Sequence, residues 1–101
     1  MTEEPINLGD ETQVKKRQRK DEIQRQRELD DLNAVLDTPQ GRRVMWRVLG
    51  FSKTFHTVFN SNALVMAHNE GQRNVGLWLT AEITEASTDN YLLMQKEASN
   101  G

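Results

Sequence analysis

The chain has 101 residues, no cysteine, a formal net charge of -2 and a mean hydropathy of -0.76. This length allows one domain at most, and the lack of cysteine excludes disulfides and most structural zinc sites. No apolar run approaches the roughly 20 residues of a membrane span, and the acidic N-terminus lacks the apolar segment of a secretory signal. We therefore expect no membrane contact, no metal and no other cofactor.

Large apolar residues are unevenly distributed, because almost all of them follow Leu29. A folded part of about 70 residues buries only ~60% of the surface that its unfolded chain exposes, so its stability is marginal. Such cores are usually reinforced by disulfides, by a metal or by association with other chains. Without cysteine, association remains, and we expect a homo-oligomer or a multimer bound to a larger ring.

Charged residues are segregated along the chain. Residues 1–13 sum to -4, residues 14–27 to +5 and the remainder to -3. Residues 1–11 combine a proline, a glycine and four acids without apolar periodicity, which is typical of a disordered acidic tail. Residues 12–36 lack proline and glycine and are rich in helix formers, so they predict a basic helical arm whose last third packs on the core.

The function of this arm stays open between three alternatives. It is a solubilising helix, it binds nucleic-acid phosphate, or it binds an acidic protein surface. Against nucleic acid, no aromatic residues are interleaved for base stacking, and the neighbouring Asp21 and Glu22 repel phosphate. The cations of the arm are Lys15, Lys16, Arg17, Arg19, Lys20, Arg25 and Arg27.

Residues 37–97 are predicted to form a compact helical domain. Proline disfavours helical geometry at the residue before it, so the arm helix ends by Asp37. Thr38 as N-cap and Pro39 at the first helical position then begin a second helix. Gly50 is expected to end it as the residue just beyond the helix.

Three further helices are expected after Gly50. A short one covers residues 51–60, with the rings of Phe51, Phe55 and Phe59 facing the core. The longest covers residues 63–86, and the last covers residues 89–97, with residues 98–101 frayed. In the longest helix, the stripe predicted to face the core comprises Leu64, His68, Gly71, Val75, Trp78 or Leu79, and Ile83.

Two glycines, Gly71 and Gly76, lie inside the longest predicted helix. Each costs about 1 kcal/mol relative to alanine in a helix interior. Their presence indicates either close approach of a neighbouring backbone or a break in the helix near Gly71. The complete pattern predicts an all-α fold, a small bundle of four or five helices with an extended charged N-terminal helix or arm.

No catalytic residues are evident. A nucleophile other than cysteine needs a base beside it, and neither His56 nor His68 has an acid or a metal ligand at a suitable spacing. Glu82 and Glu85 have the appearance of an exposed helix face rather than of a catalytic pair. A domain this small also has little room for a sizeable pocket. We therefore expect a binding protein, not an enzyme.

Candidate partner-binding residues lie on the second helix and on the longest one. Glu70, Arg73 and Asn74 interrupt apolar positions, and three interpretations remain open: a solvated face, a buried ion pair with an arginine of the second helix, or a partner site. The two tryptophans are either interface anchors or core residues. The full set is Arg42, Arg43, Trp46, Arg47, Glu70, Arg73, Asn74 and Trp78.

Several segments carry a resemblance to a known family. These are residues 32–36, the run Thr38-Pro39-Gln40-Gly41-Arg42-Arg43, residues 46–49, the run Asn69-Glu70-Gly71-Gln72-Arg73-Asn74-Val75-Gly76-Leu77, and residues 91–94. With them, residues 27–97 resemble a family of small proteins of tailed, podovirus-type bacteriophages, typified by a protein of a Bordetella phage. The resemblance excludes the acidic tail and the basic arm.

The resemblance implies a phage protein encoded among head genes, near those of the portal and capsid, without catalytic residues to carry over. We therefore expect a minor structural or assembly accessory protein that binds the portal or head region through its helical core. It would be found in the virion after assembly in the host cytoplasm, with DNA contact by the arm as one alternative. The other functional hypothesis is a small phage regulatory protein that binds a host enzyme or nucleic acid during infection.

Overall fold

The chain forms one long helix between residues 8 and 36. In the computed structural model, which describes residues 8–100, α1 spans Leu8–Leu36. Acidic side chains in its first turn, Asp10 and Glu11, are favoured by the partial positive charge of a helix N-terminus. α1 therefore begins at Leu8, inside the range 1–11 predicted as an acidic tail, while residues 1–7 lie outside the described part.

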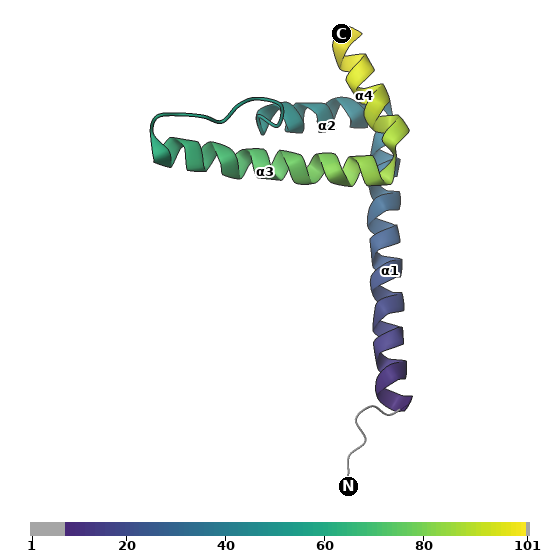
Figure 1. Cartoon of the computed structure of the whole chain (residues 1–101). Coiled ribbons are helices and arrows are strands. Elements are labelled where there is room, and N and C mark those ends of the chain that lie inside the picture. The colour runs from purple at the N-terminus through teal and green to yellow at the C-terminus, as the bar shows by residue number, and fades with distance from the viewer. Residues whose placement is uncertain (1–7, 101) are drawn as a thin grey trace.

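Three more helices complete the fold between residues 8 and 100. They are α2 (Pro39–Phe51), α3 (Ala63–Ala86) and α4 (Thr88–Asn100). Figure 1 shows α2 and α3 lying side by side, with α1 and α4 leaving in opposite directions from one end of this pair. The prediction of an all-α fold with an extended N-terminal helix is confirmed, with the lower of the two expected helix numbers.

The junction between α1 and α2 follows the sequence signals. The Thr38 side chain accepts a hydrogen bond from the Gly41 amide at 3.0 Å, and Pro39 occupies the first turn. Gly41 is required for a steric reason, because a Cβ there would lie 1.8 Å from the carbonyl oxygen of Val35. The two helices therefore meet backbone to backbone at this corner.

The end of α2 differs from the prediction. The helix continues through Gly50 to Phe51, and Lys53 takes the left-handed conformation, with φ of 56°. The Lys53 amide donates to the Gly50 carbonyl and the Thr54 amide to the Leu49 carbonyl, which is the Schellman pattern of helix termination. Lys53 thus has the place expected of Gly50, although a left-handed conformation costs a non-glycine residue about 1–2 kcal/mol.

The short helix predicted over residues 51–60 is wrong. After Phe51 the chain turns and then runs without regular structure to Asn62, which caps α3 by accepting from the amides of Leu64 and Val65. The three phenylalanine rings do not face the core, since Phe51 is 80% exposed, Phe55 51% and Phe59 78%. β-Branched residues such as Thr54, whose hydroxyl bonds the Leu49 carbonyl, favour this non-helical path.

α3 is continuous through both glycines, so the break near Gly71 does not occur. The two positions have different surroundings. A Cβ at Gly76 would lie 1.8 Å from Thr54 Oγ1, whereas a Cβ at Gly71 would meet nothing within 4 Å. Close approach therefore explains Gly76 and leaves Gly71 facing open space.

The side of α3 that packs on the core was predicted only in part. Ile83 is buried in the core and Leu79 packs against it, as expected. The rest of the predicted stripe is exposed: Leu64 is 82% exposed, Val75 56% and Trp78 62%. In its place Gly76 is buried against Ser52 and Thr54, just beyond the end of α2.

α4 begins at Thr88, with the Ser87 hydroxyl accepting from the Asn90 amide at 3.1 Å. It continues to Asn100, beyond the predicted end at Glu97. Residues 98–100, where fraying was predicted, are thus part of α4, and Gly101 lies outside the described part.

The core of the fold is small. Each helix contributes one fully buried apolar side chain: Leu36, Leu49, Ile83 and Met94. The radius of gyration is 20.2 Å, whereas a compact chain of this length has about 13 Å. The accessible surface is 7678 Å², against about 5,800 Å² expected for a compact monomer of this mass. The fold thus leaves much more surface open than a closed bundle would.

Candidate partner-binding site

A groove runs between α2 and α4, and its first component is a partly buried ion pair. Arg42, 8% exposed, donates to Glu97 from Nε at 2.8 Å and from Nη2 at 3.0 Å. Its Nη1 donates to the Leu36 carbonyl at the C-terminus of α1. The Arg42 hydrogen bonds hold the pKa of the Glu97 carboxyl below its ordinary value, in spite of partial desolvation. Arg42 therefore connects α1, α2 and α4, and its hydrogen bonds are made within the fold.

The other components of the groove are exposed cations above an apolar floor. The groove has a volume of about 660 Å³. Trp46 is half-buried and stacks on Phe55, with ring centroids 5.5 Å apart and planes 27° apart. The lining residues are Arg42, Arg43, Trp46, Arg47, Met94, Glu97, Ala98 and Asn100.

Arg43 and Arg47 differ from Arg42 in being exposed. Neither forms an ion pair with any residue between 8 and 100. A guanidinium presents several N–H donors in a planar fork that matches a carboxylate. Together with Trp46 and Met94, these two arginines suit a ligand that combines carboxylates with an apolar side chain.

The predicted residues on α3 do not join this groove. Glu70 pairs with Arg73 one turn along the same helix, at 3.2 Å, with both side chains at least one third exposed. The alternative pairing of Glu70 with an arginine of α2 is not formed, since Arg42 pairs with Glu97. Asn74 and Trp78 are exposed on α3. The predicted partner-binding residues therefore fall into two separate surfaces.

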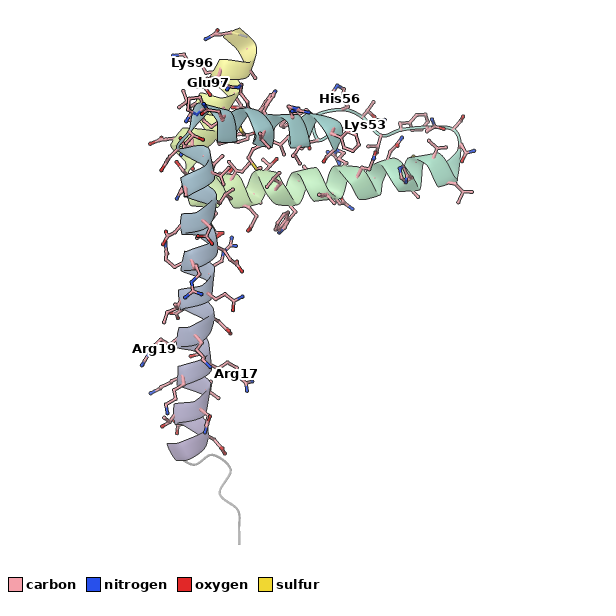
Figure 2. The ribbon with its side chains drawn as sticks, turned by 180° about the vertical axis from the view of Figure 1, so that it is seen from behind. Arg17, Arg19, Lys53, His56, Lys96 and Glu97 are labelled. Carbon is pink, nitrogen blue, oxygen red and sulfur yellow. The ribbon has the colours of Figure 1, made fainter. Side chains whose placement is uncertain are left out.

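The predicted cations of the basic arm also fall into two groups, those that are exposed and Arg25. Lys15, Lys16, Arg17, Arg19, Lys20 and Arg27 are all exposed. Figure 2 shows Arg17 and Arg19 projecting from α1 at a level well away from the other helices. These cations remain available to a partner, in agreement with the prediction of a projecting arm.

Arg25 was predicted to belong to the same set of cations, but its guanidinium is hydrogen-bonded within the fold. Its Nη1 and Nη2 each donate to a Glu82 carboxylate oxygen at 2.7 Å, and Nη2 also donates to Glu85. Glu28 adds a contact at 3.2 Å. The hydrogen bonds from Arg25 hold the pKa of Glu82 below its ordinary value, and those from the three carboxylates raise the pKa of Arg25. Glu82 and Glu85 are thus an anchor for α1 and not merely a solvated face.

Sequence reasoning missed both Glu97 and the Arg25 anchor. Glu97 lies 55 residues from Arg42, and Glu82 lies 57 residues from Arg25. No local pattern indicates which distant acid meets which base. The only signal was that Glu82 and Glu85 lie one turn apart on a helix.

The described residues contain neither a metal-ligand cluster nor a membrane-spanning helix. Between residues 8 and 100 no group of three or more His, Asp or Glu lies together as a metal-ligand set. In the same range no helix is long and apolar enough to cross a membrane.

Comparison with known proteins gives one family. The model of a family described as Bbp19-like phage protein matches residues 32–96, which confirms the resemblance seen in the sequence. The matched range contains α2, α3 and most of α4 but little of α1. Of the groove it includes the α2 side and Met94, whereas Glu97, Ala98 and Asn100 lie just beyond it. No curated protein and no solved structure matches the chain.

Proposed function

Because the chain belongs to the family of Bbp19-like phage proteins, we propose that it is a minor structural or assembly accessory protein of the virion. It binds the portal or head region through the groove between α2 and α4, in several copies. Its role is to bind, without catalysis, and it reaches the virion during assembly in the host cytoplasm.

The observation that carries this proposal is the groove itself, lined by Arg43 and Arg47 over Trp46 and Met94. Arg43 and Arg47 have no ion-pair partner among residues 8–100, and the floor of the groove is apolar. Interface anchors are enriched in tryptophan and arginine. The partner that fits is a segment of a larger phage protein with an apolar side chain flanked by carboxylates.

The groove offers little support for chemistry. Arginine has no acceptor and does not lose its proton in proteins, so it cannot act as a general base. The one carboxylate in the groove, Glu97, is held in its charged form by Arg42. His56 does not line the groove, and the side chain lies on the connection between α2 and α3 (Figure 2). These features favour a binding function of the groove over a catalytic one.

A second candidate function rests on the arm. Five exposed cations between Lys15 and Lys20 project beyond the folded part. A small regulatory protein that binds a host enzyme or nucleic acid during infection would use such a surface. Contacts with several phosphates would make nucleic-acid binding steeply dependent on salt.

Mass spectrometry of purified virions separates the two functions. The proposal expects a fixed copy number per particle, and a chain that is abundant in infected cells but absent from purified particles would overturn it. The groove is tested by the double variant Arg43→Glu/Arg47→Glu, which should lower the copy number at least about tenfold.

The matched control is Lys53→Glu/Lys96→Glu, which changes the net charge equally at exposed residues outside the groove. Figure 2 shows both lysines. This control should be incorporated at the wild-type level. Equal incorporation of both double variants would exclude the groove as the contact.

A further inference from the structure

The exposed face of α3 carries a regular stripe that the fold does not use. Its members are spaced by four and three residues alternately: Leu64, His68, Gly71, Val75 and Trp78. This is the spacing at which one helix packs along another. All five are exposed, and Trp78 and Val75 are each more than half exposed.

The stripe is distinct from the side of α3 that packs on α2. At 100° per residue, Gly76 and Ile83 lie roughly 110° around the helix from its centre. The stripe also contains no Asp, Glu, Lys or Arg. Glu70 and Arg73 are the only ions of α3 before Glu82, and they lie on other sides of the helix and pair with each other. An apolar face without charge is typical of the centre of an interface.

The arm bounds this face at one end. Glu82 continues the stripe by one step beyond Trp78, and its carboxylate receives two hydrogen bonds from Arg25 of α1. Asn33 of α1 donates to the Ala86 carbonyl at 2.9 Å. α1 therefore leaves α3 on the same side as the stripe, and the two helices form the inner corner seen in Figure 1.

We propose that this face binds the same face of a second copy, with the two α3 helices antiparallel and a two-fold axis at Gly71. The ends of the stripe, Leu64 and Trp78, lie seven residues on either side of Gly71, and His68 and Val75 lie three and four residues from it, so the two copies' stripes overlap along their whole length in this arrangement. In this register Leu64 lies opposite the second copy's Trp78, so that a large side chain meets a smaller one. Gly71, where a Cβ would meet nothing within 4 Å, meets its own copy and lets the helices approach closely.

The corner with α1 supports both the antiparallel direction and the length of the contact. A parallel pair would place both α1 helices at the same end, each crossing toward the other copy, where they would collide. In the antiparallel pair they lie at opposite ends. The second copy's α3 begins at Ala63, which falls opposite Leu79 and so stops just short of Glu82, where α1 crosses.

This pairing leaves the groove between α2 and α4 open, because none of the stripe residues lines it. The dimer is therefore independent of the proposed function. It concerns the isolated chain, whereas the virion experiment concerns the groove, and either can fail while the other holds.

Sedimentation equilibrium of the full chain tests the pairing. The wild type should have twice the mass of one chain, 11.6 kDa, at micromolar concentration. Val75→Glu places a charge in the stripe and should raise the dissociation constant by roughly 100-fold or more. Leu92→Glu on α4 is the matched control, since Leu92 is 55% exposed and Val75 56%, and it should remain dimeric. A wild type that stays monomeric, or a Val75→Glu variant that stays dimeric with unchanged helicity, would overturn the proposal.

Disulfide cross-linking tests the register, because the chain has no cysteine of its own. Under mild oxidation, Gly71→Cys should form a covalent dimer, and Leu64→Cys should not. A mixture of Leu64→Cys and Trp78→Cys proteins should form a cross-linked heterodimer. Cross-linking of Leu64→Cys with itself at the rate of Gly71→Cys would show a parallel pair and overturn the antiparallel arrangement.

Discussion

The close approach at Gly76 gives a stability prediction in which two opposing contributions to the free energy of unfolding can be estimated. Gly76→Ala removes the helix penalty of glycine, which favours the variant by about 1 kcal/mol. Against this, the new Cβ would lie 1.8 Å from Thr54 Oγ1 and 3.0 Å from the Cβ atoms of Ser52 and Thr54. The nearest pair must separate by more than 1 Å to reach ordinary contact.

Thr54 cannot give way without loss. It is 4% exposed, and its hydroxyl donates to the Leu49 carbonyl at 2.9 Å. Moving it leaves a buried polar group unpaired, which costs about 1–3 kcal/mol, and pushing the segment aside costs about 1–3 kcal/mol as overpacking. After subtraction of the propensity gain, Gly76→Ala should destabilise the fold by roughly 1–5 kcal/mol.

Thermal unfolding followed by circular dichroism at one protein concentration measures this effect. For a domain of this size 1 kcal/mol corresponds to about 4–8 °C, so the midpoint should fall by at least about 5 °C. Gly50→Ala is the matched control, because it lies in a helix with nothing within 4 Å of the new Cβ, and its midpoint should rise or stay. Thr54→Ala should partly rescue Gly76→Ala, giving a non-additive double variant. A rise in the midpoint of Gly76→Ala equal to that of Gly50→Ala would refute the packing argument.

Three further predictions concern the caps and ion pairs. Thr38→Ala removes the N-cap of α2 and should lower the free energy of unfolding, measured with urea, by about 1 kcal/mol. Thr38→Ser should lower it little, and equal losses in both variants would contradict the role of Thr38 as N-cap. Because the pKa values of Glu82 and Glu97 are lowered in the folded state, their stabilisation is complete above about pH 4.5 and is lost as the pH falls through the lower folded values. The urea concentration at the unfolding midpoint should therefore fall on acidification. Glu97→Gln should be less stable at pH 7, and its midpoint should depend less steeply on pH. An unchanged pH dependence would count against the Arg42–Glu97 pair. Arg25→Ala should speed amide hydrogen exchange in α1 N-terminal to the anchor, while Arg19→Ala should not, and equal rates in both would remove Arg25 as the anchor.

The helix boundaries that the sequence predicted well are those set by local chemistry. Thr38 and Pro39 determine the start of α2 through a hydroxyl acceptor and a fixed φ, and both act within four residues. A close approach was also expected at the interior glycines, and it occurs at Gly76, although the neighbouring atoms belong to the side chains of Ser52 and Thr54 and not to a backbone. These signals need no knowledge of the rest of the chain.

Apolar periodicity located only the C-terminal end of the core-facing side of α3, at Leu79 and Ile83, because it does not indicate which apolar surface a helix buries within its own chain. The stripe before them, with Leu64 and Trp78, is exposed, whereas the packed side there has Gly76 against the side chain of Thr54. The spacing of the phenylalanines also led to a wrong prediction. It fits a helix over residues 51–60, whereas α2 ends at Phe51 and Lys53 takes the left-handed conformation. The Arg25 and Arg42 ion pairs depend on contacts more than 50 residues apart.

The two proposed surfaces have a joint consequence, because they lie on different helices and neither blocks the other. A dimer through α3 carries two grooves, one per copy. Where the groove's partner is repeated on a ring or shell, the second contact forms at the effective concentration set by the first, which raises the overall affinity without any new contact. Val75→Glu should then lower the copy number per virion while leaving the affinity of a single groove for a soluble partner fragment unchanged. Arg43→Glu/Arg47→Glu should instead abolish fragment binding and leave the dimer intact. If Val75→Glu lowered both quantities, the two surfaces would be coupled, and the separation argued from the geometry of α3 would be wrong.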